Sequence, residues 1–212
     1  TMAPSVSYWD CGEFIAVSYT LGVPHPPGSP LFLLLGRIAS MLPISDDIAF
    51  RVNLLSPLAS SFAVLFLYFT IVQLVKHWRG KIETKTDALI AFGAGLVGAL
   101  TFAFTDSHWF NAVEAEVYAF STFFTAIVVW LALLWSEKAD EEGHERYILI
   151  IAYMIGLATG LHLLNLLTIP FVALLIYFRK FKFKWSSFGI LVALTGLVFF
   201  IIHNVIIKGM PK

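Results

Sequence analysis

Two carboxylates lie three residues apart near the start of the chain, in the segment 8–14, Tyr-Trp-Asp-Cys-Gly-Glu-Phe. One turn of helix would place Asp10 and Glu13 on the same face. A carboxylate that is partly buried beside an apolar surface can serve as a general base. The alternative is a solvated acidic turn that Trp9 anchors at a membrane interface, and the segment alone leaves both interpretations open.

A histidine follows in a proline-rich turn that runs from Pro24 to Pro30. Prolines so close together remove helix hydrogen bonds and favour extended backbone. We therefore expect the charge-free stretch that starts at Phe14 to be a loop. A short helix at the membrane interface should follow it, from about Pro30 to Leu42. A preset turn would hold His25 against an anionic ligand with little further loss of conformational entropy. A rigid turn without a ligand is the alternative.

Two further acids, Glu114 and Glu116, lead directly into an apolar stretch. A carboxylate at the bilayer centre costs roughly 2.5 to 3.5 kcal/mol on insertion scales, and less near the interface. Because the two are only two residues apart, a helix would turn them to different sides, and only one need face a site. Each is either a site residue or an acid solvated at the interface.

A histidine and an amide, His162 and Asn165, interrupt the longest stretch without Asp, Glu, Lys or Arg, residues 147–178. Hydrogen bonds that satisfy the backbone at a helix break are one interpretation of this pair. Contact with a phosphate or with an acceptor hydroxyl is the other.

The composition indicates what must position these residues. Of 212 residues, 58% are hydrophobic and only 13% are charged, and the mean hydropathy is +0.82. Soluble domains carry about 25% charged residues, so a membrane protein is indicated. The fourteen basic residues balance the fourteen acidic ones, and without a basic excess we expect no nucleic-acid partner. The single cysteine, Cys11, excludes an internal disulfide and a cysteine-based zinc site.

The expected fold is an all-α, polytopic transmembrane bundle with about six spanning helices and the short interfacial helix. A span needs about 20 apolar residues. The charge-free stretches of that kind are 54–75, 88–105, 117–136, 147–178 and 186–207. The fourth is too long for one span, so we split it at His162 and Asn165. The chain then forms a single membrane domain, 1–212, with an external segment 1–50 and transmembrane helices over 51–207.

Basic residues in the short connections predict the orientation, because they favour the cytoplasmic side. The connections around 76–85 and 179–184 are both basic, and the split of 147–178 lets both face the cytoplasm. Counting the spans also places the connection 137–146 on the cytoplasmic side, although it is mostly acidic and the rule favours basic residues there. Residues 1–50, the turn 106–116 and the turn 162–165 then share the non-cytoplasmic side.

Several common motifs are absent or misplaced. Residues 93–98 match the dinucleotide pattern G-x-G-x-x-G, but they lie within a span and favour close helix packing through Ala91, Gly95 and Ala99. The sequence has no H-E-x-x-H, P-loop or G-x-S-x-G motif. These absences disfavour zinc proteases, nucleotidases and serine hydrolases.

Five patches, taken in order, carry a family resemblance. They are Trp9-Asp10-x-Gly12-Glu13-Phe14, His25-Pro26-Pro27-Gly28-x-Pro30-Leu31-Phe32, Arg51-Val52-Asn53, Val113-Glu114-Ala115-Glu116-Val117-Tyr118 and Gly160-x-His162-Leu163-Leu164-Asn165. The ordered set resembles the glycosyltransferase family 117 proteins (domain-of-unknown-function 2723), which have the GT-C membrane fold and include a protein O-mannosyltransferase. Family members normally have an earlier membrane helix and continue further. We therefore expect a fragment, with an anchor helix before Thr1 and more chain after Lys212.

The resemblance implies transfer of a mannose-like hexose, with inversion, from a polyprenyl- or dolichyl-phosphate sugar to a protein Ser or Thr hydroxyl on the non-cytoplasmic side. It makes Asp10 the expected general base and Glu13 the second candidate. The donors available to the leaving phosphate are His25, Arg37, Arg51 and His162. The residues expected to orient the acceptor or the sugar are Glu114, Glu116 and Asn165.

The implied partners are a lipid-linked sugar donor, an acceptor protein and the lipid bilayer. No cofactor or metal is required by this chemistry, although Asp10 with Glu114 or Glu116 would suit magnesium or manganese. The long bacterial members point to a multi-pass protein of the bacterial inner membrane, with the endoplasmic reticulum as the eukaryotic counterpart.

Two other classes of function remain open. A secondary transporter with buried carboxylates would have its site near the bilayer midplane on broken helices, whereas most candidate residues here cluster at one face. A noncatalytic scaffold subunit would pack through its small-residue faces, and it predicts that Asp10 and Glu13 tolerate replacement by Asn and Gln.

Overall fold

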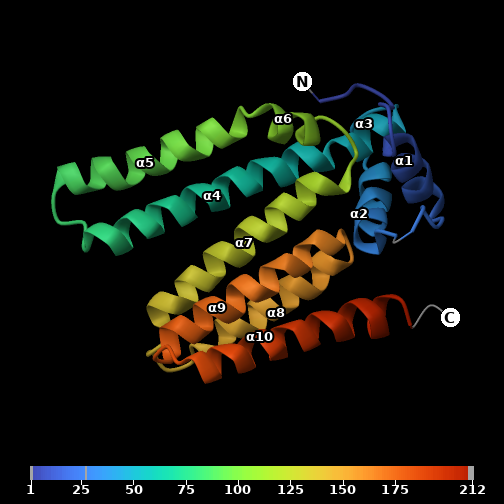
Figure 1. Ribbon diagram of the computed structural model, residues 1–212. Helices are drawn as coiled ribbons and strands as arrows, with labels where there is room; N and C mark the ends of the chain where they lie inside the picture. The colour runs from blue at the N-terminus through green and yellow to red at the C-terminus, as the bar shows by residue number, and fades with distance from the viewer. Residues whose placement is uncertain (1, 27, 210–212) are drawn as a thin grey trace.

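The computed structural model describes residues 2–26 and 28–209, and every regular element within them is a helix (Figure 1). The predicted all-α bundle is therefore confirmed. In chain order the elements are α1 (Cys11–Thr20), α2 (Pro30–Ser40), α3 (Ile48–Asn53), α4 (Leu55–Arg79), α5 (Lys85–Ala103), α6 (Asp106–Ala112), α7 (Val117–Lys138), α8 (Glu145–Thr159), the 3₁₀ turn η1 (Leu163–Leu167), α9 (Thr168–Lys180), α10 (Trp185–Phe200) and the π-helical η2 (Ile201–Ile207). Thr1 and Lys212, beyond which further chain is expected, lie outside the described residues, as does Pro27.

Within the described residues, five helical segments are long and apolar enough to cross a membrane. They are Ile48–Arg79, Lys85–Ala103, Val117–Lys138, Leu163–Lys180 and Trp185–Ile207. The sixth expected span corresponds to α8, which has only 15 residues, fewer than the roughly 20 that a span needs. The chain is thus a multi-pass bundle of five membrane-length helices with a shorter α8 packed against α7.

The predicted break in the stretch 147–178 is confirmed, and polar side chains stabilise it. Helix α8 ends at Thr159, and the chain resumes in η1 and α9. The amide of Asn165 donates to the carbonyl oxygens of Ala158 at 3.3 Å and His162 at 3.0 Å. The backbone N–H of Leu164 donates to Nδ1 of His162 at 3.2 Å. The ring of His162 thus gives the N–H of Leu164 a partner, and the amide of Asn165 ties the end of α8 to the turn that follows.

Three short helices, α1, α2 and α3, form a cap at one end of the bundle (Figure 1). The expectation of a loop beginning at Phe14 is wrong, because α1 continues to Thr20. No proline precedes Pro24 within this stretch, so nothing in it removes a helix hydrogen bond. Leu21 then ends the helix in the left-handed conformation with φ 53°. The predicted short helix is confirmed as α2, with Pro30 at its first position, where proline is favoured.

The two ends of the bundle differ in charge. The α4–α5, α7–α8 and α9–α10 connections lie at the end away from the cap (Figure 1). The basic residues in or beside them are Lys76, Arg79, Lys81, Lys85, Lys138, Arg146, Arg179, Lys180, Lys182 and Lys184. Asp140, in the acidic α7–α8 connection, pairs with Arg179 and with Lys180 of α9. The acidic connection therefore lies beside a basic one, which explains its place at this end.

An aromatic core joins the cap to the spans. The ring of Phe32 on α2 packs edge-on against Phe14 of α1 and Phe120 of α7, with centroid separations of 5.3 and 6.0 Å. Such pairs contribute about 0.5 to 1.5 kcal/mol each beyond the burial of their area. Leu161, in the turn after α8, is buried in the same cluster. The cap, the start of α7 and the turn after α8 are thereby held in one arrangement.

The small residues that matched the dinucleotide pattern serve helix packing. Ala91, Gly95 and Ala99 are the buried residues of α5, and α5 lies along α4. A Cβ atom on Gly95 would stand 2.6 Å from Cγ2 of Val72. The close approach of α4 and α5 therefore depends on glycine at this position.

Candidate functional site at the capped end of the bundle

The two carboxylates at the start of α1 lie on one side of its first turn. Asp10 is the N-cap residue and Glu13 lies in the first turn. The carboxylate of Asp10 makes no capping hydrogen bond, and 55% of its side chain is exposed. The helix dipole favours anions at this end. The predicted helical spacing is therefore observed, with one carboxylate left accessible.

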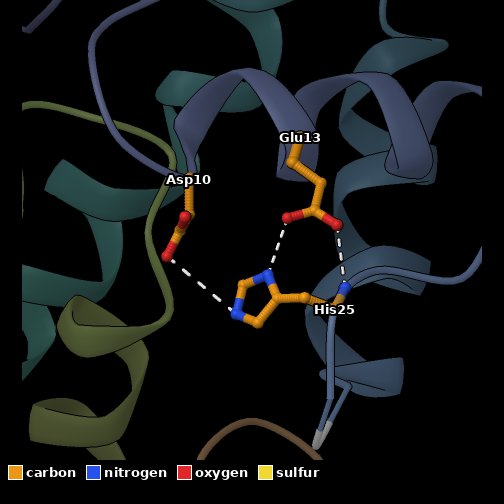
Figure 2. A group of neighbouring side chains, drawn as sticks. All are labelled: Asp10, Glu13 and His25. Carbon is orange, nitrogen blue, oxygen red and sulfur yellow. Dashed lines mark hydrogen bonds and ion pairs between the residues drawn. The ribbon is translucent and has the colours of Figure 1, made fainter.

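The carboxylate of Glu13 binds His25 through both of its oxygens (Figure 2). Oε1 accepts the backbone N–H of His25 at 2.8 Å, and Oε2 lies 2.6 Å from Nδ1 of the ring. Nε2 faces Asp10, whose Oδ2 is 3.9 Å away. The turn places the ring here because the N–H of Gly28, which has φ +80°, donates to the carbonyl oxygen of His25 at 3.0 Å. The structure thus brings Asp10, Glu13 and His25 together.

Charge within this group follows from the contacts. The hydrogen bonds from the His25 ring and backbone lower the pKa of Glu13 below its ordinary value. The bond to Glu13 in turn raises the pKa of His25, with smaller contributions from Asp10 and Glu116, while burial acts in the opposite direction. Glu13 and His25 therefore stabilise each other as an ion pair.

The acids before α7 are both buried and both face α1. Glu114 and Glu116 are 5% and 7% exposed. The expectation that they point to different sides is wrong, because residues 113–116 are not helical and Glu116 adopts an extended conformation before α7 begins. The thiol of Cys11 lies 3.8 Å from Oε1 of Glu116. Burial, followed by the charge of Asp10, raises the pKa of Glu116 to about 7.

Burial and the neighbouring carboxylates also raise the pKa of the Cys11 thiol, with burial the largest cause. The thiol is therefore neutral and donates towards Glu116. Cys11 is a fully buried side chain, and its thiol lies against the buried acids before α7.

A residue that is not among the predicted site residues, Asn53, holds these segments in place. Asn53 at the end of α3 is 0% exposed. Its amide donates to the carbonyl oxygens of Ala3 at 3.0 Å and Ser5 at 2.9 Å, and its oxygen accepts the N–H of Ala115 at 3.0 Å. In the sequence, Asn53 was notable only as part of the patch Arg51-Val52-Asn53. A buried amide needs polar partners, but the sequence does not show which groups they are.

The turn after α8 lies beside the start of α2. The backbone N–H of Leu31 donates to the carbonyl oxygen of Gly160 at 3.0 Å, and Oγ of Ser29 donates to that of Leu161 at 2.9 Å. The ring of His162 packs against Tyr118 of α7 at a centroid separation of 5.3 Å, and burial lowers the pKa of His162. His162 is therefore a neutral side chain at the edge of the site.

Asn165 is 1% exposed, and its side chain is engaged within the turn and with α7. Besides the two bonds donated by its amide, its oxygen accepts from Oγ1 of Thr125 at 3.2 Å. These contacts favour the interpretation that Asn165 satisfies the helix break rather than contacting a ligand.

The two arginines expected near the phosphate are directed elsewhere. Arg37 donates to the carbonyl oxygen of Tyr19 at 2.5 Å and lies over that ring. Arg51 donates to the carbonyl oxygens of Ser45 at 2.6 Å and Ser40 at 2.7 Å. Both guanidinium groups therefore stabilise connections within the cap, and the structure does not bring them to the acid cluster.

The spacing of Asp10, Glu13 and His25 would also admit a cation, since one ligand atom from each lies within 4.8 Å of the others. The 2.6 Å contact between Glu13 and His25 is, however, a hydrogen bond. In this arrangement the carboxylate of Glu13 and the ring of His25 are therefore joined directly.

Comparisons with known proteins agree on one family. The sequence model described as "Protein O-mannosyl-transferase TMEM260 N-terminal domain" matches residues 10–185. The chain is 32% identical over 215 residues to protein O-mannosyl-transferase tmem260 of Dictyostelium discoideum, covering 94% of this chain and 24% of that protein. It is 29% identical over 195 residues to protein O-mannosyl-transferase TMEM260 of Mus musculus, covering 92% and 26%. The chain thus spans about a quarter of the length of these relatives. No solved structure matches it.

Proposed function

Because the chain belongs to the family of protein O-mannosyl-transferase TMEM260 N-terminal domains, we propose that it carries the acid cluster of a membrane enzyme that transfers mannose to protein Ser or Thr hydroxyls. The observation that carries this proposal is the convergence of Asp10, Glu13, His25 and Glu116, from three separate segments, at one end of a membrane bundle. An accessible carboxylate beside an oriented histidine is a suitable arrangement for removing a proton from an alcohol.

The proposed donor is a polyprenyl- or dolichyl-phosphate mannose, and the proposed acceptor is a protein. Both meet at the capped end, which we assign to the non-cytoplasmic side because the basic connections gather at the opposite end. A lipid-linked donor can present its phosphate at the membrane surface while its chain stays in the bilayer. We therefore propose that the chemistry takes place in the cap and not within the spans.

Asp10 is the base in this scheme. Both oxygens of Glu13 are engaged by His25, whereas the carboxylate of Asp10 is more than half exposed and makes only the 3.9 Å approach to His25. As the acceptor oxygen bonds to the anomeric carbon, its proton passes to Asp10. The bond between that carbon and the phosphate oxygen breaks, and the phosphate leaves with the electron pair. A single displacement of this kind inverts the anomeric configuration.

Glu116 is proposed to assist the same step by hydrogen bonding. With a pKa of about 7, it is partly protonated near neutral pH, so its carboxyl can both donate and accept a hydrogen bond. A group of this kind suits the hydroxyls of a sugar. Glu114 is also buried, and its charge acts on Cys11 and Glu116.

The endoplasmic reticulum is the proposed location. The two relatives come from a slime mould and a mouse, and the expected bacterial inner membrane gains no support from them. The finer placement of the chain within glycosyltransferase family 117, with a GT-C fold, remains a prediction.

The test uses membranes that carry the full-length parent protein. Radiolabelled mannose from dolichyl-phosphate mannose should be transferred to a pool of Ser/Thr peptides, and Asp10→Asn should reduce transfer by about 100-fold or more. Asp46→Asn is the matched control, because Asp46 is an exposed acid of the same cap. Equal membrane levels of all three proteins would exclude misfolding. Full activity of Asp10→Asn would refute the assignment of the base, and no transfer by the intact protein would refute the function.

A further inference from the structure

The imidazole of His25 lies between carboxylates on both of its nitrogen atoms (Figure 2). Nδ1 is 2.6 Å from Oε2 of Glu13, and Nε2 faces Oδ2 of Asp10 at 3.9 Å. An ionised carboxylate accepts hydrogen bonds and cannot donate them. Both ring nitrogens therefore act as donors only when the ring carries two protons, and this environment favours the imidazolium cation.

The other titratable groups around the ring are acidic or neutral, so His25 carries the positive charge of the site. Glu116, from the segment before α7, adds a third carboxylate that favours the cation. Cys11 has a raised pKa and is neutral, and His162 has a lowered pKa and is neutral. Arg37 and Arg51 bind backbone carbonyl groups within the cap. Among the described residues of the site, His25 is thus the side chain able to offset the charge of an anionic ligand.

An anion that enters this group of acids needs such a cation. The phosphate of a lipid-linked donor is negatively charged, and its charge increases when the glycosidic bond breaks. Nε2 is not within hydrogen-bonding distance of Asp10, so its N–H is available to an entering oxygen. The acceptor oxygen and the departing phosphate oxygen lie on opposite sides of the anomeric carbon, so they need different partners. Asp10 and Nε2 of His25, 3.9 Å apart, are two such groups.

Resting on the function proposed above, we propose that Glu13 is a positioning residue that holds His25 as an imidazolium, and that the Nε2–H group of His25 binds the phosphate of the lipid-linked donor. Glu13 fixes both the backbone and the ring of His25, so its removal frees the ring to rotate. In the transfer step, His25 donates a hydrogen bond to the departing phosphate oxygen while Asp10 receives the acceptor proton. The two acids of α1 thereby have different roles.

The state of the ring can be measured without any transfer reaction. Diethyl pyrocarbonate modifies neutral imidazole but not imidazolium, and mass spectrometry of the full-length protein reports each histidine separately. In the wild type, His25 should become reactive only at a pH above the ordinary pKa of a histidine, because its bond to Glu13 favours the imidazolium. Glu13→Gln should move the reactivity of His25 to lower pH and increase its rate near pH 7 several-fold. Asp46→Asn should leave the profile unchanged.

The phosphate role is measured by the binding of dolichyl phosphate to the full-length protein in nanodiscs at pH 6.5. His25→Gln should weaken binding about ten-fold, which corresponds to one charge-assisted hydrogen bond. Glu13→Gln should weaken it as well, because the ring then loses the bond that holds it in place and favours its charge. His203→Gln is the matched control.

The possible outcomes separate this inference from the function on which it rests. An unchanged modification profile in Glu13→Gln would overturn the positioning role, even if mannose is transferred. A shifted profile combined with full phosphate binding by His25→Gln would overturn the phosphate role. If the intact protein neither binds dolichyl phosphate nor transfers mannose, the proposed function and the phosphate role fail together, and the profile still decides whether Glu13 holds an imidazolium.

Discussion

The substitution Asn53→Ala tests whether a single buried amide holds together the segments around the site. The side chain makes hydrogen bonds to Ala3, Ser5 and Ala115, each with a net contribution of about 1 kcal/mol. For the bond to Ala115 the cost is instead about 1 to 3 kcal/mol, because the N–H of Ala115 is left buried without its partner. We therefore expect a loss of about 3 to 5 kcal/mol in the local stability of the cap.

Hydrogen exchange in the full-length protein measures this loss directly, because it reports local opening. Exchange of the peptide that contains Ala115 should accelerate about 100-fold or more in Asn53→Ala, since 1.4 kcal/mol corresponds to a factor of ten. Peptides from the α9–α10 connection, at the other end of the bundle, should exchange as in the wild type. The transfer of mannose should fall as well, because the segment that carries Glu116 loses its anchor.

Asn111→Ala is the matched control. Asn111 lies on α6, only four positions before Ala115, and its side chain makes no hydrogen bond to the described residues. We expect its effect on exchange to stay within about 0.5 kcal/mol, as for other surface changes. If Asn53→Ala and Asn111→Ala accelerate exchange equally, the three contacts of Asn53 do not anchor the site, and the reasoning is refuted.

Two further predictions concern burial and packing. The pKa of Glu116 rises from 4.5 to about 7, so the folded state binds the extra proton between these values, and stability should fall as the pH rises through that range. Thermal unfolding as a function of pH should show this loss in the wild type and not in Glu116→Gln. Gly95→Leu should destabilise the protein by about 1 to 3 kcal/mol, because the side chain would overlap Val72. Gly93→Leu should unfold at the wild-type temperature, because an added Cβ there would have no atom of the other described helices within 4 Å.

The helical spans could be predicted because the bilayer imposes a simple rule on sequence. Stretches without charged residues correspond closely to α4, α5, α7, α9 and α10. The break at His162 and Asn165 was also predictable, since two polar side chains in the middle of an apolar stretch must satisfy the backbone. The split at this break predicts two short helices, and α8, with 15 residues, is the first of them.

The arrangement of the site was less predictable, because its contacts join residues far apart in sequence. The spacing of Asp10 and Glu13 indicated a shared helix face, and the structure shows one. The sequence could not show that Arg37 and Arg51 bind backbone carbonyls, since any arginine near an apolar segment has the same appearance. Treating Glu114 and Glu116 as helical residues was wrong because the helix begins only at Val117.

The position of the acids follows from the cost of placing charge in a membrane. A carboxylate at the bilayer centre is strongly unfavourable, whereas one at a helix N-terminus is stabilised by the helix dipole. Glu13 lies in the first turn of α1 and Glu116 is the N-cap residue of α7, so both occupy such positions. The aromatic core of the cap joins α1 to α7, and this packing fixes the distance between the two helix ends. The acids of the proposed site therefore lie at helix ends and outside the five membrane-length helices.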